Sequence, residues 1–182
     1  MKVVNLFAAP GTGKTTTGQL LSGLLSVSNY KVEYLPEFAK FATLSNNQSA
    51  LSDQIYMFAK QQNRLHVLKN AGLDYVIMDG PLPIALLFQP PGYFKLYEPL
   101  VMEVFQSYDN VNFLLQRNPD LPYKTLGRNE TEAQAKALDR QVRDILERYA
   151  LPHETFVVNQ ALPFILFERL TGVRAPLQPS LH

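Results

Sequence analysis

Short apolar segments alternate along the chain with longer segments in which apolar residues recur at helical spacing. The short segments predict five buried strands, over residues 2–7, 31–35, 74–79, 110–116 and 154–158. Helices are predicted directly after the first strand and over about 50–70, 94–108, 130–149 and 160–171. This alternation predicts an α/β domain with a doubly wound, five-stranded parallel sheet and helices on both faces.

Some of these segments carry finer patterns. The first helix has Leu20, Leu21, Leu24 and Leu25 on one face, and the 50–70 helix has Leu51, Ile55, Phe58, Leu65 and Leu68. Asn129 is expected to cap the 130–149 helix, with Glu132 as the capping-box partner and a buried stripe at Leu138, Val142, Ile145, Leu146 and Tyr149. The Pro-rich segment 81–93 predicts a loop with one short helical turn. We expect a single domain over 1–172 and a frayed tail over 173–182.

The segment between the first strand and the first helix carries the candidate chemistry. Residues 8–15 read AAPGTGKT, which fits the phosphate-binding P-loop pattern G-x-x-x-x-G-K-[ST] except that Ala8 replaces the first Gly. Glycines let backbone N–H groups turn towards an anion, and the helix start adds the positive end of its dipole. We expect ATP phosphates to bind Pro10, Gly11, Thr12, Gly13, Lys14, Thr15 and Thr16. Lys14 would lie near the β- and γ-phosphates, and the Thr15 hydroxyl would bind Mg²⁺.

Two acidic residues follow neighbouring predicted strands. Ligands of doubly wound sheets bind beyond the carboxyl ends of the strands, where Glu37 and Asp79 are found. We assign Asp79 to Mg²⁺, because it follows a buried apolar strand, and Glu37 to the role of general base. The two roles could be exchanged. Asp79 could also be a turn or cap residue, and Glu37 a first-turn acid favoured by the helix dipole.

The polar loop over 117–129 is predicted to be a lid. It carries Arg117, Lys124 and Arg128, and loops of this length without secondary structure are usually functional or disordered. Cations that close over the γ-phosphate stabilise its charge and exclude water, so Arg117 and Arg128 are candidate catalytic residues. The alternative is a solvated basic loop.

Polar and aromatic residues between 38 and 64 could line an acceptor pocket. Gln54, Gln61 and Arg64 share the polar side of the 50–70 helix, and amides can read the edge of a base. A solvated helix face is the equal alternative. The aromatic residues Phe38, Phe41 and Tyr56 could stack on a base, although core packing is the simpler interpretation.

Bulk properties narrow the class of protein. The 182 residues are 46% hydrophobic and 18% charged, which is typical of a globular domain. A net charge of +1 gives no general attraction for nucleic acid, so such binding would need a local basic patch. No apolar stretch approaches the roughly 20 residues that span a bilayer, and no secretory signal is visible, so we expect a cytoplasmic protein without a membrane partner. ATP is the expected donor because the guanine-reading N-K-x-D motif is absent.

The segments FAAPGTGKTTT, EYLPEFAK, DYVIMDGPLP and YKTLGRNETEAQAKALDRQVRDIL together resemble a family of small P-loop kinases. This family includes the nicotinamide riboside kinase domain of bacterial NAD-pathway proteins and small bacteriophage kinases. Among the phage kinases the chain is most similar to the thymidylate-kinase-like 5-hydroxymethyluracil DNA kinases. The resemblance implies ATP- and Mg²⁺-dependent phosphorylation of the hydroxymethyl group of 5-hydroxymethyluracil in phage DNA, a step towards hypermodified thymine. The protein would then act in the host cytoplasm.

Other functions remain compatible with these residues. The acceptor could be a free deoxynucleoside, a nucleoside monophosphate or nicotinamide riboside. An NTPase switch or motor would hydrolyse ATP without an acceptor. A regulatory module would bind ATP without turnover, although the Glu37 and Asp79 pair and the predicted lid argue against it.

Overall fold

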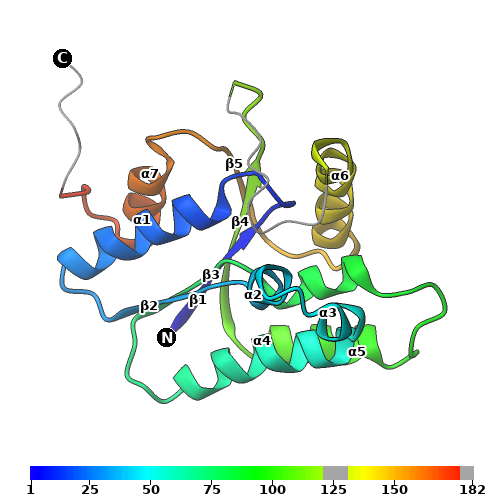
Figure 1. Ribbon diagram of the computed structural model, residues 1–182. Helices are drawn as coiled ribbons and strands as arrows, with labels where there is room; N and C mark the ends of the chain where they lie inside the picture. Colours follow the sequence, from blue (N-terminus) through cyan, green and yellow to red (C-terminus); the bar gives the residue numbers. More distant parts are fainter. Residues whose placement is uncertain (121–130, 177–182) are drawn as a thin grey trace.

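A five-stranded, all-parallel sheet forms the centre of the molecule (Figure 1). The computed structural model describes residues 1–120 and 131–176. The strands are β1 (Lys2–Phe7), β2 (Val32–Leu35), β3 (Tyr75–Met78), β4 (Asp109–Gln116) and β5 (Glu154–Val157), and their order in the sheet is β2-β3-β1-β4-β5. The predicted fold class is therefore confirmed. Because the chain runs outwards on both sides of β1, the loop after β1 lies at the point where ligands bind in such sheets.

Helices cover both faces of the sheet, as predicted. On one face lie α1 (Lys14–Val27) and α7 (Leu162–Thr171), which pack against each other (Figure 1). The other face is covered by α4 (Gln54–Leu68), α5 (Tyr97–Gln106), α6 (Glu132–Arg148) and the 3₁₀ segment η1 (Leu82–Phe88). The short helices α2 (Phe38–Leu44) and α3 (Gln48–Ser52) connect β2 to α4.

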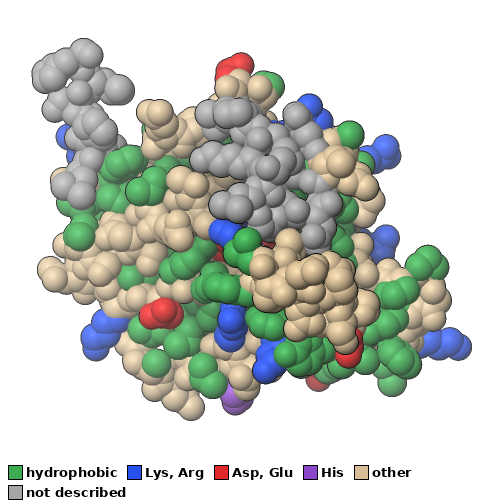
Figure 2. Space-filling model, in the orientation of Figure 1, with side chains coloured by type: hydrophobic (Ala, Val, Ile, Leu, Met, Phe, Trp, Pro, Cys, Tyr) green, Lys and Arg blue, Asp and Glu red, His purple; other side chains and the backbone are tan. Residues whose placement is uncertain are grey.

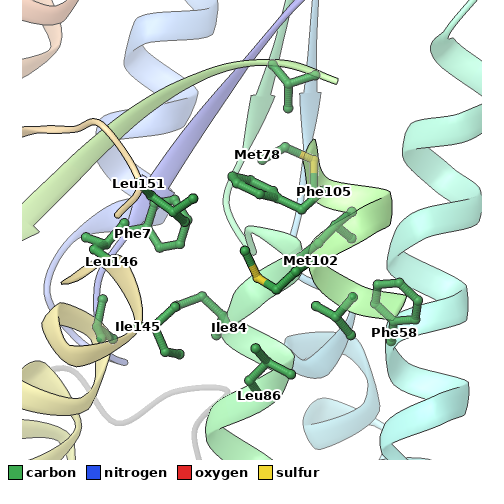
Figure 3. Close-up of a cluster of buried hydrophobic side chains, with 14 of the residues drawn as sticks. Phe7, Phe58, Met78, Ile84, Leu86, Met102, Phe105, Ile145, Leu146 and Leu151 are labelled. Atoms are coloured by element: carbon green, nitrogen blue, oxygen red, sulfur yellow. The ribbon is translucent and has the colours of Figure 1, made fainter. Parts of the chain in front are cut away.

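Alternating side chains of β1 enter two separate cores. Val4 and Leu6 pack with residues of α1 and α7. Val3 and Phe7 point to the opposite face and pack with residues of α4, α5 and α6. Figure 3 shows Phe7 in this second core, among side chains from the helices that cover it. Side chains of successive strand residues alternate between faces, so a strand buried on both faces is apolar throughout.

Asn5 interrupts the apolar run of β1 and is 1% exposed. Its Nδ2 donates to Oδ1 of Asn110 at 2.9 Å and to Oδ1 of Asn112 at 3.0 Å, both on β4. Asn112 in turn donates to the Pro152 carbonyl at 3.0 Å. Because these amides need each other to satisfy their buried polar groups, they fix the register of β1 against β4.

The predicted helix over 50–70 is two helices. The chain turns at Asn46, which has φ of 51°, and α3 ends at Ser52, directly before Asp53. Asp53 then caps α4 by accepting a 3.0 Å hydrogen bond from the Tyr56 N–H. This break moves Ile55 out of the predicted buried face, and its side chain is 46% exposed.

The predicted cap of α6 was wrong by two residues. Thr131 is the cap: its hydroxyl accepts from the Gln134 N–H at 3.3 Å, and the Gln134 side chain accepts from the Thr131 N–H at 2.8 Å. Asn129 lies outside the described residues. In the segment expected as a tail, Ala175 is buried against the core shared by α1 and α7. None of the described helices is long and apolar enough to cross a membrane.

Candidate active site

The loop between β1 and α1 has the geometry of a phosphate-binding loop. Gly11 and Gly13 adopt φ values of 79° and 113°, which side chains disfavour. A Cβ on Gly13 would also lie 2.9 Å from Cγ1 of Val158. Helix α1 begins directly afterwards at Lys14, so its N-terminus faces the loop. The conformation thus offers backbone N–H groups and a helix dipole to an anion.

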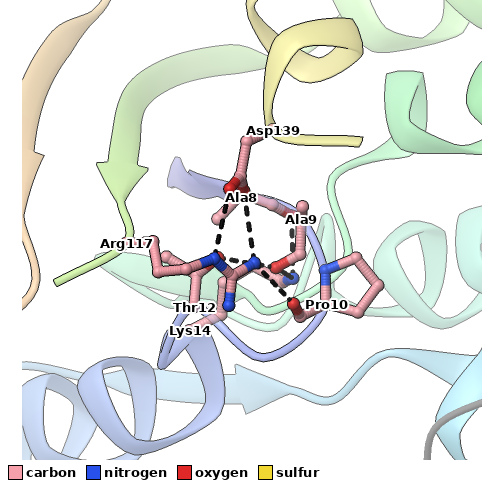
Figure 4. Close-up of polar contacts among 7 residues, drawn as sticks. All are labelled: Ala8, Ala9, Pro10, Thr12, Lys14, Arg117 and Asp139. Carbon is pink, nitrogen blue, oxygen red and sulfur yellow. Dashed lines mark hydrogen bonds and ion pairs between the residues drawn. The ribbon is translucent and has the colours of Figure 1, made fainter. Parts of the chain in front are cut away.

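Lys14 is folded back over this loop. Its Nζ donates to the carbonyls of Ala8 at 2.8 Å and Ala9 at 3.3 Å, while the Thr12 hydroxyl donates to Ala9 at 2.9 Å (Figure 4). Lys14 is only 7% exposed, and within the described parts of the chain no carboxylate forms an ion pair with it. A buried cation with only neutral partners favours the arrival of an anion such as a phosphate.

Asp79 collects two hydroxyl donors on one oxygen. The Thr15 hydroxyl donates to Oδ2 at 2.7 Å, and the Tyr34 hydroxyl donates to the same atom at 2.8 Å. The residue is 1% exposed, and its other oxygen, Oδ1, has no partner among the described residues. The structure thus joins the predicted pair Thr15 and Asp79, and adds Tyr34.

Tyr34 was not predicted as a site residue. Burial, followed by the charge of Asp79 and the hydrogen bond to it, raises the pKa of the Tyr34 hydroxyl far above its ordinary value. Tyr34 therefore remains a neutral donor. Its ring reaches this position because residue 18 is glycine: a Cβ there would lie 2.9 Å from Cε2 of Tyr34.

The donor set around Asp79 fits a divalent cation held together with phosphates. No group of three or more His, Cys, Asp or Glu among residues 1–120 and 131–176 could hold a metal alone. Within the described parts of the chain, Asp79 instead offers a buried carboxylate oxygen without a partner, beside the hydroxyl of Thr15. Mg²⁺ is commonly bound by one or two protein oxygens, waters and substrate phosphates, and these residues suit that arrangement.

Glu37 lies at the start of α2 and is close to Gly80, the residue that follows Asp79. It is the N-cap residue of this helix, and its side chain packs on Gly80, where a Cβ would approach Glu37 Cγ to 3.0 Å. The side chain also lines a pocket between α2, α4 and η1. The two acids expected at the strand ends are thus neighbours in the fold, with Asp79 on the side of the P-loop and Glu37 on the side of the pocket.

This pocket is mostly apolar. Its walls come from α2, α4 and η1 with the short turn before η1, and they include Phe38, Met57, Phe58, Leu82, Ile84, Ala85 and Phe88. The polar side chains lining it are those of Glu37, Gln54 and Gln61. From the sequence the two glutamines were equally compatible with an acceptor pocket and with a solvated helix face, and in the structure both line this pocket. An apolar cleft with a few polar groups is the usual form of a small-molecule site.

Arg117 is anchored to the P-loop. Its Nε and Nη2 lie 3.1 and 3.4 Å from the carboxylate oxygens of Asp139, and Nη2 donates to the Pro10 carbonyl at 3.0 Å (Figure 4). Arg117 therefore links β4 and α6 to the phosphate-binding loop, a role that the sequence did not predict. Lys124 and Arg128 of the predicted lid lie outside the described residues.

Comparisons with known proteins agree with this architecture. Residues 3–161 match a family model described as an AAA domain. A deoxyadenosine kinase from M. mycoides, solved with dCMP and dCDP, is similar over 95% of this chain and all of its own, with a TM-score of 0.59 and 18% identity. NadR, solved with NAD and AMP-PNP, gives a TM-score of 0.71 at 18% identity over 98% of this chain, which spans 51% of the NadR chain. No curated protein matched the sequence.

Proposed function

The chain belongs to the AAA domain family, and from that premise we propose that it is a kinase that transfers the γ-phosphate of ATP to a hydroxyl of a nucleoside-type acceptor. One observation carries the proposal. A phosphate-binding loop with Thr15 and Asp79 adjoins, through the Asp79–Gly80 turn, an apolar pocket that Glu37 lines. A site for the donor phosphates beside a pocket with its own carboxylate suits transfer to a second substrate.

The surroundings of the two acids favour different roles. Oδ2 of Asp79 already accepts from Thr15 and Tyr34, and Oδ1 suits a cation or its bound water, so we assign Asp79 to Mg²⁺. Glu37 faces the acceptor pocket, so we assign it as the general base. The acceptor oxygen would attack the γ-phosphorus, the bond from that phosphorus to the β–γ bridging oxygen would break, ADP would leave, and the acceptor proton would pass to Glu37.

The P-loop would supply the electrostatic part of the reaction. Lys14 would turn from the Ala8 and Ala9 carbonyls to the β- and γ-phosphates, joined by the N–H groups of residues 10–16. Bound Mg²⁺ would neutralise phosphate charge. Arg117 holds the Pro10 carbonyl and thereby the loop, and Arg128 remains a candidate for closing over the γ-phosphate.

In its most specific form the proposal names 5-hydroxymethyluracil in DNA as the acceptor. The resemblance of the sequence motifs to phage hydroxymethyluracil kinases supports this form, and the apolar pocket is suited to a flat base. On the face seen in Figure 2, Lys and Arg side chains are scattered among other types and form no continuous basic surface among the coloured residues. A free nucleoside, a nucleotide or nicotinamide riboside is the alternative acceptor.

A transfer assay with γ-labelled ATP and Mg²⁺ tests the function. The acceptors are DNA with 5-hydroxymethyluracil, matched thymine DNA, free pyrimidine nucleosides and monophosphates, and nicotinamide riboside, with products identified by mass. Lys14→Ala should abolish transfer, and Glu37→Gln should slow the chemical step with little change in ATP binding. Label on hydroxymethyl DNA alone would support 5-hydroxymethyluracil in DNA as the acceptor. Label on a free nucleoside or nucleotide would instead indicate an enzyme of salvage or cofactor metabolism. Acceptor-independent hydrolysis, or ATP binding without turnover, would overturn the kinase proposal.

A further inference from the structure

Two buried side-chain polar atoms have no hydrogen-bond partner within the described parts of the chain: Oδ1 of Asp79 and Nε2 of Gln61. The Mg²⁺ of the proposed function would account for the first. The second lies on the other side of the site, because Gln61 belongs to α4 and lines the acceptor pocket. Gln61 is 8% exposed, and a buried donor without an acceptor is costly unless a ligand supplies one.

The orientation of the Gln61 amide is fixed by the backbone. Its Oε1 accepts a 3.1 Å hydrogen bond from the Phe38 N–H, which can only donate. The amide therefore cannot be turned over without placing two donors against each other. The NH₂ group of Gln61, with both of its protons unpaired among the described residues, is left for a ligand. The same bond ties Gln61 to the peptide that follows Glu37, so the donor and the proposed base are held in one frame.

Other groups in the pocket do not supply the missing acceptor. The second amide, Gln54, uses its own Nε2 to donate to the Leu51 carbonyl at 2.9 Å. Apart from Glu37, the remaining walls are apolar and partly aromatic, with Phe38, Phe58 and Phe88 among them. Such walls favour a flat ring, and a ring that also satisfies Gln61 must carry a lone pair at its edge.

We propose that Gln61 determines acceptor specificity by donating from Nε2 to an oxo oxygen of a base bound in the pocket. The inference rests on the proposed function and deepens it, because it names the substrate class: a base that presents a carbonyl, and not an amino group, at this edge. An amino group there would leave two donors facing each other. Sites that lose a buried hydrogen-bond partner in this way usually discriminate by about tenfold or more.

A chemical double-mutant cycle tests the proposal. The acceptors are 5-hydroxymethyl-2′-deoxyuridine and its 2-thio and 4-thio analogues, because sulfur accepts hydrogen bonds poorly. Each is tested with the unaltered protein and with Gln61→Met, which keeps the length of the side chain but removes the donor. Asn63→Met, at an exposed position of the same helix, is the matched control. Both kcat/KM for transfer and the equilibrium Kd of the acceptor are measured.

In the unaltered protein and in Asn63→Met, we expect one thio analogue to bind about tenfold more weakly than the parent acceptor. In Gln61→Met, the same analogue and the parent should bind equally well. The KM for ATP should stay the same in all three. If Gln61→Met does not fold, Gln61→Glu is the second variant. It places an accepting oxygen where Nε2 stands, so it should lose binding of the parent acceptor. Equal penalties with and without Gln61, or no binding of any of the three acceptors, would overturn the inference. Selective binding without transfer would support it while overturning the kinase proposal.

Discussion

Tyr34 donates a 2.8 Å hydrogen bond to Oδ2 of Asp79, the same oxygen that accepts from the Thr15 hydroxyl. These three side chains come from β2, from the end of β3 and from α1. The hydrogen bonds occupy one oxygen of the carboxylate, and the other, without a partner among the described residues, is the one that we propose binds Mg²⁺. Tyr34, together with Thr15, therefore fixes the orientation of the Asp79 carboxylate.

Tyr34→Phe should weaken the cation site without removing the fold. The variant loses one hydrogen bond to a buried carboxylate, so we expect the free energy of unfolding to fall by about 2 kcal/mol. The Mg²⁺ concentration for half-maximal activity should rise, while the KM for the acceptor stays unchanged. Urea unfolding and a Mg²⁺ titration at saturating ATP measure the two effects. An unchanged Mg²⁺ requirement would show that Tyr34 serves packing alone.

Gly18→Ala should be destabilising, and Gly23→Ala on the same helix should be stabilising. An added Cβ at position 18 would meet Tyr34 at 2.9 Å, Leu6 at 3.1 Å and Ile77 at 3.3 Å, whereas one at position 23 meets nothing within 4 Å. Overpacking typically costs about 1–3 kcal/mol, and Gly to Ala in a helix interior gains about 0.5–1 kcal/mol. Thermal unfolding of the pair gives the comparison directly. Similar melting temperatures for the two variants would contradict the close packing of Tyr34 on α1.

Stability should fall at alkaline pH in part through Tyr97. Burial, with smaller contributions from Tyr93 and Asp53, raises the pKa of Tyr97 above its ordinary value near 10, and its hydroxyl donates to the Gln54 carbonyl at 2.9 Å. The unfolded chain loses this proton first, so the contribution is complete below about pH 10 and declines as the pH rises further. Urea unfolding between pH 8 and 11 should show that the free energy of unfolding declines less steeply in Tyr97→Phe than in the unaltered protein. Parallel curves would exclude Tyr97 as a source.

Arg117→Ala should perturb the phosphate-binding loop, and Asp139→Asn should produce part of the same effect. Arg117 is largely buried, with a side-chain exposure of 14%, and holds both Asp139 and the Pro10 carbonyl. We expect a loss of about 1–3 kcal/mol of stability and weaker ATP binding for Arg117→Ala, and non-additive effects in the double variant. Arg128→Ala, in contrast, should slow transfer with an unchanged melting temperature. Additive losses for Arg117 and Asp139 would mean that the pair does not act as a unit.

The sequence predicted the sheet, the phosphate-binding loop and the acids at the strand ends because each depends on local pattern. The break at Asp53 and the Thr131 cap were also readable. Asp53 stands three residues before Tyr56, and T-E-A-Q fits a capping box. The first was missed because the apolar periodicity over 50–70 appeared continuous, and the second because Asn129 with Glu132 has the same capping-box spacing.

The roles of Tyr34 and Gln61 depend on contacts between distant segments and could not be read locally. Nothing in the strand sequence KVEYL shows that its tyrosine reaches over Gly18 to an acid 45 residues later. Gln61 appeared equally suited to a solvated face. Only the pairing of its oxygen with Phe38, 23 residues away, fixes the amide in the pocket wall.

The central place of β1 has a consequence for synthesis of the protein. Among the described strands, β1 pairs with β3 and β4, which begin at residues 75 and 109. Until those two segments have been synthesised, both edges of this apolar strand lack their native partners, and unpaired strand edges promote aggregation. Asn5 places an amide in the middle of this strand, which native partners on β4 satisfy and an apolar foreign strand does not. We therefore expect the asparagine that fixes the finished register also to disfavour pairing of the unfinished chain with apolar foreign strands.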